Sequence, residues 1–536
     1  MSVMRITGMF SGMDIDQIVT DLMKIERTKV DRLYQQRQEL QWQKELYREI
    51  INKIRVFRDT YFDALKPDTN LTSNAALKRM LVTASHPDIV TVTATADALP
   101  GESTFRVIQS ATAAQAKAAG VTAGSEEGNR LSLSDTLEEI SGKLASGTFS
   151  FDENDEITAV INGVELTFKK SDTLRSVLSK INNSQAGVTA FYSEFSDTFT
   201  VTSHRTGAES TITAEGAFWA ALCFEPAPDG TIGEAGRDAR FVIDGFEGSR
   251  PDNTFAIDGK TYTIKKTINP EDNSPEISLR ISPDTESVYK VIESFVRDYN
   301  ELIDYINGKL NEEHFRDFPP LTDEQKKEMS EREIELWEEK AKSGLLRRDS
   351  ALTSLLEDLR RAMYDAVDGM NLTRFGIDTS SNWRDRGKLV LKNGGADLKA
   401  ALAANPDQVA EFFGKRSSIS YSATLSREER AQRYAESGLA SRLSDILNDY
   451  IRTTRDQNGN KGLLLEKAGI QGDITEFQNS YDRRINEFNK QINRMNELLL
   501  SRENAYYLQF AAMETALQRL YAQSAWLAGF FQPQAQ

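Results

Sequence analysis

The feature that most constrains the fold is an apolar stripe along the C-terminal part of the chain. Residues 485–531 form the longest amphipathic helix pattern of the chain, with a break at Arg502 after which it resumes. Its apolar members follow one another at steps of three and four residues, apart from the seven-residue step across Arg502: Ile485, Phe488, Ile492, Met495, Leu499, Tyr506, Phe510, Met513, Leu517 and Leu520. This spacing is typical of a coiled-coil seam.

A second stripe lies near the N-terminus. Leu33, Leu40, Tyr47, Ile54 and Tyr61 recur every seven residues, and Ile50, Phe57 and Ala64 follow three residues behind the later members. Each apolar side chain removed from water contributes about 1.5 to 3 kcal/mol, so neither stripe is expected to stay unpaired. We expect the two stripes to pair in this molecule or in a larger assembly. If they pair here, the intervening chain is carried at the end of a helical stalk.

The N-terminal helix is expected to begin at Asp14 or Asp16 and to continue to about Lys66, where Pro67 stops it. Its apolar face begins with Ile15, Ile18, Leu22 and Ile25. Gln36 and Gln43 fall on the stripe, where they either fix the register and admit several partners or face solvent at the base of the stalk. Residues 1–13, rich in Gly and Met, are predicted to be flexible.

The composition excludes several classes of partner. A net charge of -16 argues against binding a nucleic-acid backbone or an anionic membrane. Cys223 is the only cysteine, so no disulfide can form within the chain, which indicates a reducing compartment or an export route that bypasses oxidative folding. The N-terminus resembles no Sec signal, and no window approaches 18 apolar residues, so we expect no membrane span.

The middle of the chain changes from helical to alternating periodicity at Met80. Short β-branched segments follow at 81–85, 89–95 and 104–110, and then an Ala-, Gly- and Ser-rich link at 111–128. A small α+β module is expected next, with strands near 147–151, 156–168, 187–192 and 198–203 and a helix at 173–182. After a loop at 225–237, further strands are predicted at 239–245, 254–266 and 276–282.

Helical periodicity returns after Pro283, with an amphipathic helix at 288–310. Residues 312–342 are dense in Glu and Lys and are predicted to form an exposed insertion, helical in its second half. Further helices are expected at 350–368, 397–404, 407–413 and 437–456. The predicted fold class is therefore multi-domain α+β, with paired terminal helices, a helical bundle and a nested β-rich head.

No motif indicates an active site, a cofactor or a metal. His86, His204 and His314 are isolated from one another and from other ligand-type spacings. Residues 456–462 partly resemble a calcium loop, but Lys461 and Lys467 stand where that loop needs glycine and glutamate, so we predict a plain Gly/Asn turn. Phosphate-binding and GxSxG motifs are missing from the sequence. We therefore expect a protein that is not an enzyme.

Large aromatic side chains gather at the C-terminal end of the chain: Tyr521, Trp526, Phe530 and Phe531. Aromatic residues beyond any domain that could bury them indicate a surface for a partner. The alternative is local packing on the N-terminal helix.

Several segments together resemble the flagellar filament-capping family, hook-associated protein type 2. The N-terminal text GMFSGMDIDQIVTDLMKIERTKVDRL and the Trp-Gln-x-x-x-Tyr-Arg pattern within Leu40–Ile54 are similar to the start of that family. Ile161-Asn162-Gly163, residues 172–174, 181–182 and 187–190 are similar to the IN motif of flagellins and hook-associated proteins. The segments 238–245, 295–300, 376–377, 405–413, 501–514 and 523–527 follow in the family's order.

The resemblance implies a non-enzymatic protein, without cofactors, that leaves the cell unfolded through the flagellar type III apparatus. It would form a ring-like homo-oligomer at the distal, extracellular tip of the filament, retain flagellin there and promote its folding and insertion. The implied partners are flagellin, other copies of this chain and an export chaperone at Tyr521, Trp526, Phe530 and Phe531. Host mucin or another surface glycan is a further candidate partner of the head.

With this resemblance we predict four parts: residues 1–46 with 479–536 as a coiled-coil leg, 47–76 with 284–478 as a bundle, 77–112 with 237–283 as a β-rich head domain, and 113–236 as a second head domain. The residues expected to make filament and self-association contacts are Ile15, Ile18, Leu22, Phe510, Met513, Leu517 and Leu520. Two alternatives stay open, an adhesin at the flagellar tip and a flagellin-like or junction subunit. The WQ..LYREI and SRENAYYLQF segments favour the cap.

Overall fold

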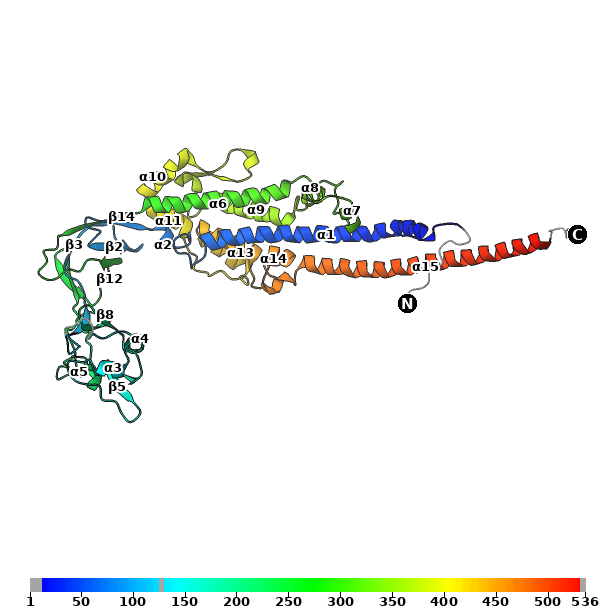
Figure 1. Cartoon of the computed structure of the whole chain (residues 1–536). Coiled ribbons are helices and arrows are strands. Elements are labelled where there is room, and N and C mark those ends of the chain that lie inside the picture. Colours follow the sequence, from blue (N-terminus) through cyan, green and yellow to red (C-terminus); the bar gives the residue numbers. More distant parts are fainter. Residues whose placement is uncertain (1–11, 125–129, 531–536) are drawn as a thin grey trace. The chain divides into compact units, whose positions relative to one another are not determined.

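The computed structural model describes residues 12–124 and 130–530, and the chain divides into two compact units (Figure 1). The first unit combines Met1–Leu77 with Thr285–Gln536, and the second is Lys78–Asp284. The second unit is thus an insertion in the sequence of the first. The predicted flexibility of residues 1–13 falls almost entirely outside the described residues.

Helix α1 (Ile15–Tyr61) begins where the Asp14 carboxylate accepts a hydrogen bond of 2.9 Å from the Gln17 amide. Asp14, and not Asp16, is therefore the cap. The helix ends one turn before the predicted Lys66, because the chain folds back on it: Leu71 N donates to the Tyr61 carbonyl at 2.9 Å and Thr69 Oγ1 donates to the Thr60 carbonyl at 2.5 Å. The carbonyl groups that would continue the helix are already taken.

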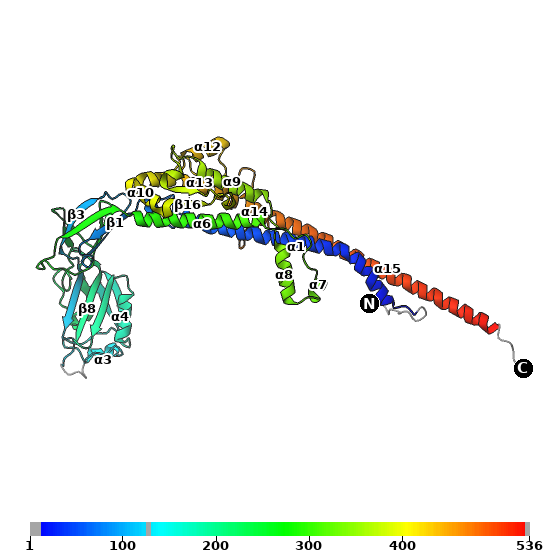
Figure 2. The ribbon, with the colours of Figure 1, turned by 90° about the horizontal axis from the view of Figure 1, so that it is seen from above.

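The C-terminal helix α15 (Ser480–Phe530) lies beside α1 (Figure 2). Lys44 Nζ is 2.5 Å from Asp482 Oδ1, and Tyr507 donates to Asp16 at 2.9 Å. Residues early in one helix thus meet residues late in the other, so the two helices are antiparallel. The pairing of the two ends is present in this molecule, while its coiled-coil form stays a prediction.

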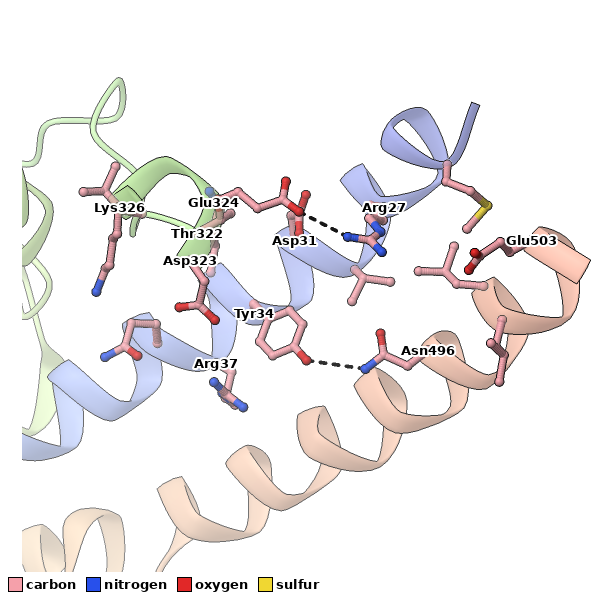
Figure 3. A pocket seen from close by; sticks show the side chains of 17 residues that line it. Arg27, Asp31, Tyr34, Arg37, Thr322, Asp323, Glu324, Lys326, Asn496 and Glu503 are labelled. Carbon is pink, nitrogen blue, oxygen red and sulfur yellow. Dashed lines mark hydrogen bonds and ion pairs between the residues drawn. The ribbon is translucent and has the colours of Figure 1, made fainter. Parts of the chain in front are cut away.

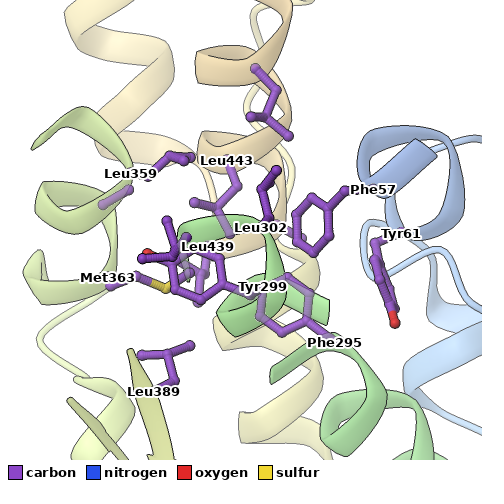
Figure 4. Packing of buried hydrophobic residues seen from close by; sticks show 14 of the residues in the cluster. Phe57, Tyr61, Phe295, Tyr299, Leu302, Leu359, Met363, Leu389, Leu439 and Leu443 are labelled. Carbon is purple, nitrogen blue, oxygen red and sulfur yellow. The ribbon is translucent and has the colours of Figure 1, made fainter. Parts of the chain in front are cut away.

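The C-terminal half of α1 belongs to a helical bundle with one continuous apolar core. The aromatic rings of Phe57, Tyr61, Phe295 and Tyr299 pack there, with 5.7 Å between the centroids of Phe57 and Phe295 (Figure 4). The other elements around this core are α2 (Asn74–Leu77), α6 (Thr285–Asn311), α9 (Ser350–Tyr364), α10 (Ala396–Ala404), α11 (Pro406–Gly414), α13 (Leu439–Ile451), α14 (Leu463–Ala468), and the hairpin β15 (Ile377–Thr379) and β16 (Leu389–Leu391). Short 3-10 helices cover Leu372–Phe375, Trp383–Asp385, Lys392–Gly395 and Ile474–Glu476.

Charged segments lie outside this core. The Glu- and Lys-rich stretch contains α7 (Asp323–Lys327) and α8 (Glu331–Lys342), each opened by a capping box. Helix α12 (Arg427–Glu436), which we did not predict, has no buried residue and begins at a capping box of Ser426 and Glu429. Because α12 buries no side chain of its own, it depends on contacts with other elements: Arg433 pairs with Asp445 of α13 at 2.6 Å.

In the second unit, a five-stranded antiparallel sheet has the strand order β1-β14-β3-β10-β11. Its strands are β1 (Met80–Ala84), β3 (Gly101–Gln109), β10 (Ala239–Ile243), β11 (Phe246–Arg250) and β14 (Ile277–Pro283). A three-stranded sheet, β12 (Thr254–Ile257), β13 (Lys260–Ile264) and β2 (Val90–Ala94), shares its core through the stacked rings of Phe105, Phe241, Phe255 and Tyr262.

Residues 113–232 of the second unit build around a separate apolar cluster that contains Trp219 and Phe218. Its strands are β4 (Ala113–Ala119), β5 (Glu156–Ile161), β6 (Val164–Lys169), β7 (Val188–Ser193), β8 (Thr198–Thr206) and β9 (Ala214–Glu215), and its helices are α3 (Leu137–Ser141), α4 (Leu174–Asn182) and α5 (Ala217–Ala221). The Ile161-Asn162-Gly163 segment is the turn between β5 and β6, with Asn162 at φ 48°.

Some predictions in this region were wrong. The supposed link at 111–128 contains β4, whose alternate residues Ala114, Ala116 and Ala118 are buried against β8. Alanine has little strand preference, so pairing with β8 and burial decide the conformation. Residues 147–151 form no strand, and α3, α5, β9 and β11 were not predicted.

The predicted α+β class with helical and β-rich parts is confirmed, and the four-part division stays a prediction. None of the described helices has a stretch long and apolar enough to cross a membrane.

Candidate assembly surface

The terminal helices contact each other through a small apolar cluster. Its buried side chains come from both helices: Ile15, Val19, Met23, Val30, Ile492 and Leu499. Leu33, Met495, Tyr506, Tyr507 and Phe510 pack partly buried against them. At about 1.5 to 3 kcal/mol for a fully buried side chain, this cluster is a much smaller source of stability than the bundle core.

The structure corrects the apolar face that we predicted for the first turns of α1. Ile15 is buried as expected, whereas Ile18 and Leu22 are half-buried and Ile25 is 73% exposed. The buried positions are Val19, Met23 and Val30. The sequence held this signal, because the seven-residue repeat of Leu33 continues back to Val19, and Met23 and Val30 are also seven residues apart.

Charged side chains interrupt the same stripe. One repeat before Leu33 stands Glu26, whose carboxylate pairs with the guanidinium of Arg502 on α15. Arg502 is the residue at which the C-terminal stripe also breaks. The two interruptions therefore meet each other across the helix pair.

Beyond Phe510, the apolar residues of α15 become progressively more exposed. Met513 and Leu517 are half-buried, while Leu520 is 60%, Tyr521 59% and Trp526 65% exposed. Local packing therefore leaves more than half of the Tyr521 and Trp526 side chains uncovered. Neither the side chain of Phe530 nor Phe531 belongs to the described residues. The predicted contact residues Phe510, Met513, Leu517 and Leu520 thus share one helix with this exposed end.

A groove of about 470 Å³ separates α1, α7 and α15 (Figure 3). On its rim Arg27 Nη1 is 3.1 Å from Glu324 Oε1, and Gln35 donates to the Pro320 carbonyl at 3.0 Å. Burial and the nearby Glu324 carboxylate raise the pKa of Asp31, which lies inside the groove. Tyr34 and Asn496 join the two long helices at the groove's other side.

The acidic insertion is held against α1 by contacts that the sequence did not reveal. Lys342 Nζ lies 5.0 Å from the centroid of the buried Trp42 ring of α1, while Trp337 Nε1 donates within the insertion to the Pro319 carbonyl at 2.8 Å. Gln43 faces this side of α1, where it donates to the Leu345 carbonyl at 3.1 Å. Gln36 is exposed, so of the two alternatives for it solvent exposure is correct.

The histidines lie apart from one another. His86 is 3.0 Å from the Ser85 hydroxyl, His204 is 3.0 Å from the Thr189 hydroxyl, and His314 is near the Ser343 carbonyl. Over residues 12–124 and 130–530, no group of His, Cys, Asp and Glu is placed to hold a metal ion. Residues 456–460 form the turn that we predict, in which Asp456 accepts from the Asn458 and Asn460 amides.

Comparison with known proteins extends over nearly the whole chain. Residues 236–522 match the family model described as "Flagellar hook-associated protein 2 C-terminus", residues 11–114 match "Flagellar hook-associated protein 2 N-terminus", and residues 140–204 match "Flagellin hook IN motif". The flagellar hook-associated protein 2 of Halalkalibacterium halodurans is 28% identical over 98% of this chain and 100% of its own length. That of Thermotoga maritima is 28% identical over 68% of this chain and 53% of its own.

A solved structure shows the same fold. The D1-D2-D3 domains of the flagellar cap protein FliD from Escherichia coli align with a TM-score of 0.50 and 17% identity, covering 76% of this chain and 97% of that one.

Proposed function

Because this chain belongs to the flagellar hook-associated protein 2 family, we propose that it is the structural cap at the distal end of a bacterial flagellar filament. In this role it works outside the cell as a ring-like homo-oligomer, retains exported flagellin and promotes its folding and insertion. The family resemblance inferred from the sequence is thereby confirmed, while the ring and its action on flagellin belong to the proposal.

The observation that carries the proposal is the exposed apolar end of α15. Leu517, Leu520 and Tyr521 continue the stripe of α15 beyond the N-terminal end of α1 at Ile15. The helix pair therefore offers an apolar surface that the described part of this chain leaves largely open. An exposed stripe of this kind is a site for protein contacts. Flagellin with terminal helices of its own is the partner that this geometry suits, together with neighbouring copies of the cap.

A cap must give way each time a new subunit is inserted. The contact between α1 and α15 buries few side chains and contains the Glu26–Arg502 pair. A charged pair in a helix seam lowers stability compared with apolar residues and restricts the register. These properties support a helix pair that can leave one arrangement for the next.

Export precedes assembly, and the same end of α15 has the features of a chaperone-binding segment. We place the chaperone contact at Tyr521, Trp526, Phe530 and Phe531, of which the first two are more than half exposed. A large aromatic side chain supplies much contact area, while binding fixes only a few of its rotatable bonds. The chaperone would cover this surface before export, and filament subunits would cover it afterwards.

Exposed apolar side chains on the second unit favour a second candidate function, adhesion. Phe195 is 92% exposed at the β7–β8 turn and Phe246 is 81% exposed at the β10–β11 turn. Such tips suit contact with a host mucin or with a neighbouring head. Binding of the purified protein to immobilised mucin, compared with a Phe195→Ser, Phe246→Ser variant, tests adhesion separately from capping.

The cap function is tested by deleting the gene in the parent bacterium and measuring filament length and monomeric flagellin in the medium. We expect short or missing filaments with released flagellin, and recovery when the gene is restored or the purified protein is added. The same additions to the undeleted strain serve as the control. Normal filaments in the deletion strain would reject the cap function and favour an adhesin or an accessory filament subunit.

A further inference from the structure

A second groove, of about 770 Å³, lies on the helical unit between the C-terminal end of α6, helix α9 and the loop that joins β15 to β16. Its charged lining consists of Arg348, Arg360 and Arg386 against the single carboxylate of Glu357. Hydroxyl and amide side chains, among them Thr353 and Asn382, complete the walls. The groove is therefore positively charged, although the whole chain carries a net charge of -16.

The three arginines are not neutralised within the groove. Among the described residues, no carboxylate oxygen lies within 4.0 Å of a guanidinium nitrogen of Arg348, Arg360 or Arg386. Elsewhere on the same unit arginines do pair, as Arg433 does with Asp445 at 2.6 Å. Guanidinium groups bind carboxylates through paired hydrogen bonds, so this groove has the chemistry to hold a carboxylate-bearing partner.

The backbone at the groove supports a function beyond stability. Arg348 has φ 58° and Arg386 has φ 47°, left-handed conformations that side chains other than Asn and Asp seldom adopt. Strained positions of this kind gather at binding sites. The third arginine is ordered by an aromatic ring, with its guanidinium carbon 5.7 Å from the Tyr364 centroid. A hydrogen bond with Thr379, aided by Arg360, lowers the pKa of Tyr364, as expected beside a positive charge.

A complementary surface is present on the same chain. Glu331, Glu335 and Glu339 of α8 are exposed and follow one another at steps of four residues, which places them on one face of the helix. Only Glu335 has an ion-pair partner among the described residues, Arg332 at 2.6 Å, and both side chains are largely exposed. Trp337 of α8 donates to the Pro319 carbonyl of the same insertion, and Lys342 at the end of α8 lies over the Trp42 ring of α1. Among the described residues, the three glutamates make no ion pair with the three arginines of their own chain.

We propose that the arginine groove of one copy binds the acidic face of α8 of the neighbouring copy. The inference rests on the homo-oligomer of the proposed function and names the contact that forms it. Because groove and helix are different surfaces, the contact is head-to-tail, and a head-to-tail contact that closes on itself gives a ring. Charge complementarity fixes which surface meets which, and it makes assembly weaken as salt rises.

Charge reversal on the full-length purified chain tests the pairing. An Arg348→Glu, Arg360→Glu variant reverses the groove, and a Glu335→Arg, Glu339→Arg variant reverses the α8 face. We expect each variant to self-associate at least tenfold more weakly in analytical ultracentrifugation at low salt. We expect the chain with all four substitutions to recover association to within about threefold of the original chain, because the pairing is restored with its charges exchanged.

Arg361→Glu is the matched control, because Arg361 follows Arg360 on α9 but does not line the groove. Its association should stay unchanged, and circular dichroism should show that every variant is folded. Unchanged association in both reversed variants overturns the proposal, and so does a combined chain that stays dissociated. Weaker filament capping by the groove variant with normal self-association would also overturn it and assign the groove to a different anionic partner. Failure of the original chain to rescue filaments would refute the cap function alone, because self-association is measured without flagellin.

Discussion

The guanidinium of Arg502 and the carboxylate of Glu26 form an ion pair at the point where the apolar stripes of α1 and α15 are both interrupted. Glu26 is the less exposed of the two, with 21% of its side chain accessible against 52% for Arg502. A pair this close to solvent contributes little to stability. The pair restricts the register of the two helices, because in any other register one charge would lie in the seam without its partner, which is unfavourable.

Replacing both residues by leucine, Glu26→Leu with Arg502→Leu, should make the two stripes continuous. We expect the helix pair to gain about 1 to 3 kcal/mol, mainly from added apolar burial. Hydrogen exchange of α1 amides should slow, and filaments assembled with the variant should be shorter because the helices release each other less readily. Glu156→Leu with Lys169→Leu, a pair in the second unit, is the control. Unchanged exchange in α1 would contradict this role of the pair.

The helix pair also shows how far the sequence can be interpreted. The seven-residue repeat of Leu33 predicts the partner face of α1 correctly when it is followed back to Val19, whereas steps counted from Ile15 lead to the exposed Ile25. Periodicity gives the existence of a long helix and its face. The exact phase depends on where the other helix lies, and a single sequence does not contain that position.

Contacts between distant segments account for what could not be predicted. The strand β4 is built from alanines that are buried only because β8 lies beside them, and α12 has no buried residue of its own. The three arginines of the groove come from α9 and from two separate loops, so no local sequence motif predicts the groove. Local pattern predicts an element when the element's own side chains decide its conformation, and fails when a partner decides it.

The exposed end of α15 offers a direct test of filament contact. Leu517→Asp with Leu520→Asp places charges on the stripe that α1 does not cover, where a buried carboxylate would cost several kcal/mol in any partner interface. We expect loss of swimming and release of flagellin, with an unchanged circular dichroism spectrum, because neither leucine belongs to a core cluster of the described residues. Gln518→Asp adds a charge to an exposed position of the same helix and should swim. Normal motility of the double variant would show that this end of α15 makes no essential filament contact.

Trp337 joins helix α8 of the acidic insertion to the loop at the start of the same insertion. Trp337→Ala removes the hydrogen bond to Pro319 and the contact with Phe318, whose ring centroid is 4.7 Å away. We expect the insertion to open locally with a loss of about 2 kcal/mol, measured as faster hydrogen exchange in α7 and α8. Leu336→Ala, at an exposed neighbouring position, should leave that exchange nearly unchanged. Equal effects of the two substitutions would show that Trp337 does not hold the insertion.

Asp349 joins three parts of the bundle. Its carboxylate caps α9 by accepting from the Ala351 and Leu352 amides at 2.9 and 3.1 Å, and Lys467 Nζ lies 3.1 Å away. The same Lys467 donates to the Tyr47 hydroxyl at 2.7 Å. Burial works to raise the pKa of Asp349, but the hydrogen bonds from Tyr47 and the Leu352 amide, with the charge of Lys467, outweigh burial and hold that pKa below its usual value.

A depressed pKa in the folded chain makes the contribution of Asp349 depend on pH in a known direction. The unfolded chain takes up the proton first as pH falls, so the stabilisation is complete well above the ordinary pKa of 3.8 and is lost as pH falls through the lower folded value. Asp349→Asn should therefore reduce the free energy of unfolding by about 1 to 3 kcal/mol at pH 7, with a difference from the original chain that shrinks steadily below pH 4. Urea unfolding followed by circular dichroism at 222 nm between pH 7 and 3 measures both values. Asp317→Asn, at an exposed carboxylate of the same unit, should show almost no difference at any pH. A constant difference for Asp349→Asn down to pH 3 would mean that the cap acts through its geometry and not through its charge.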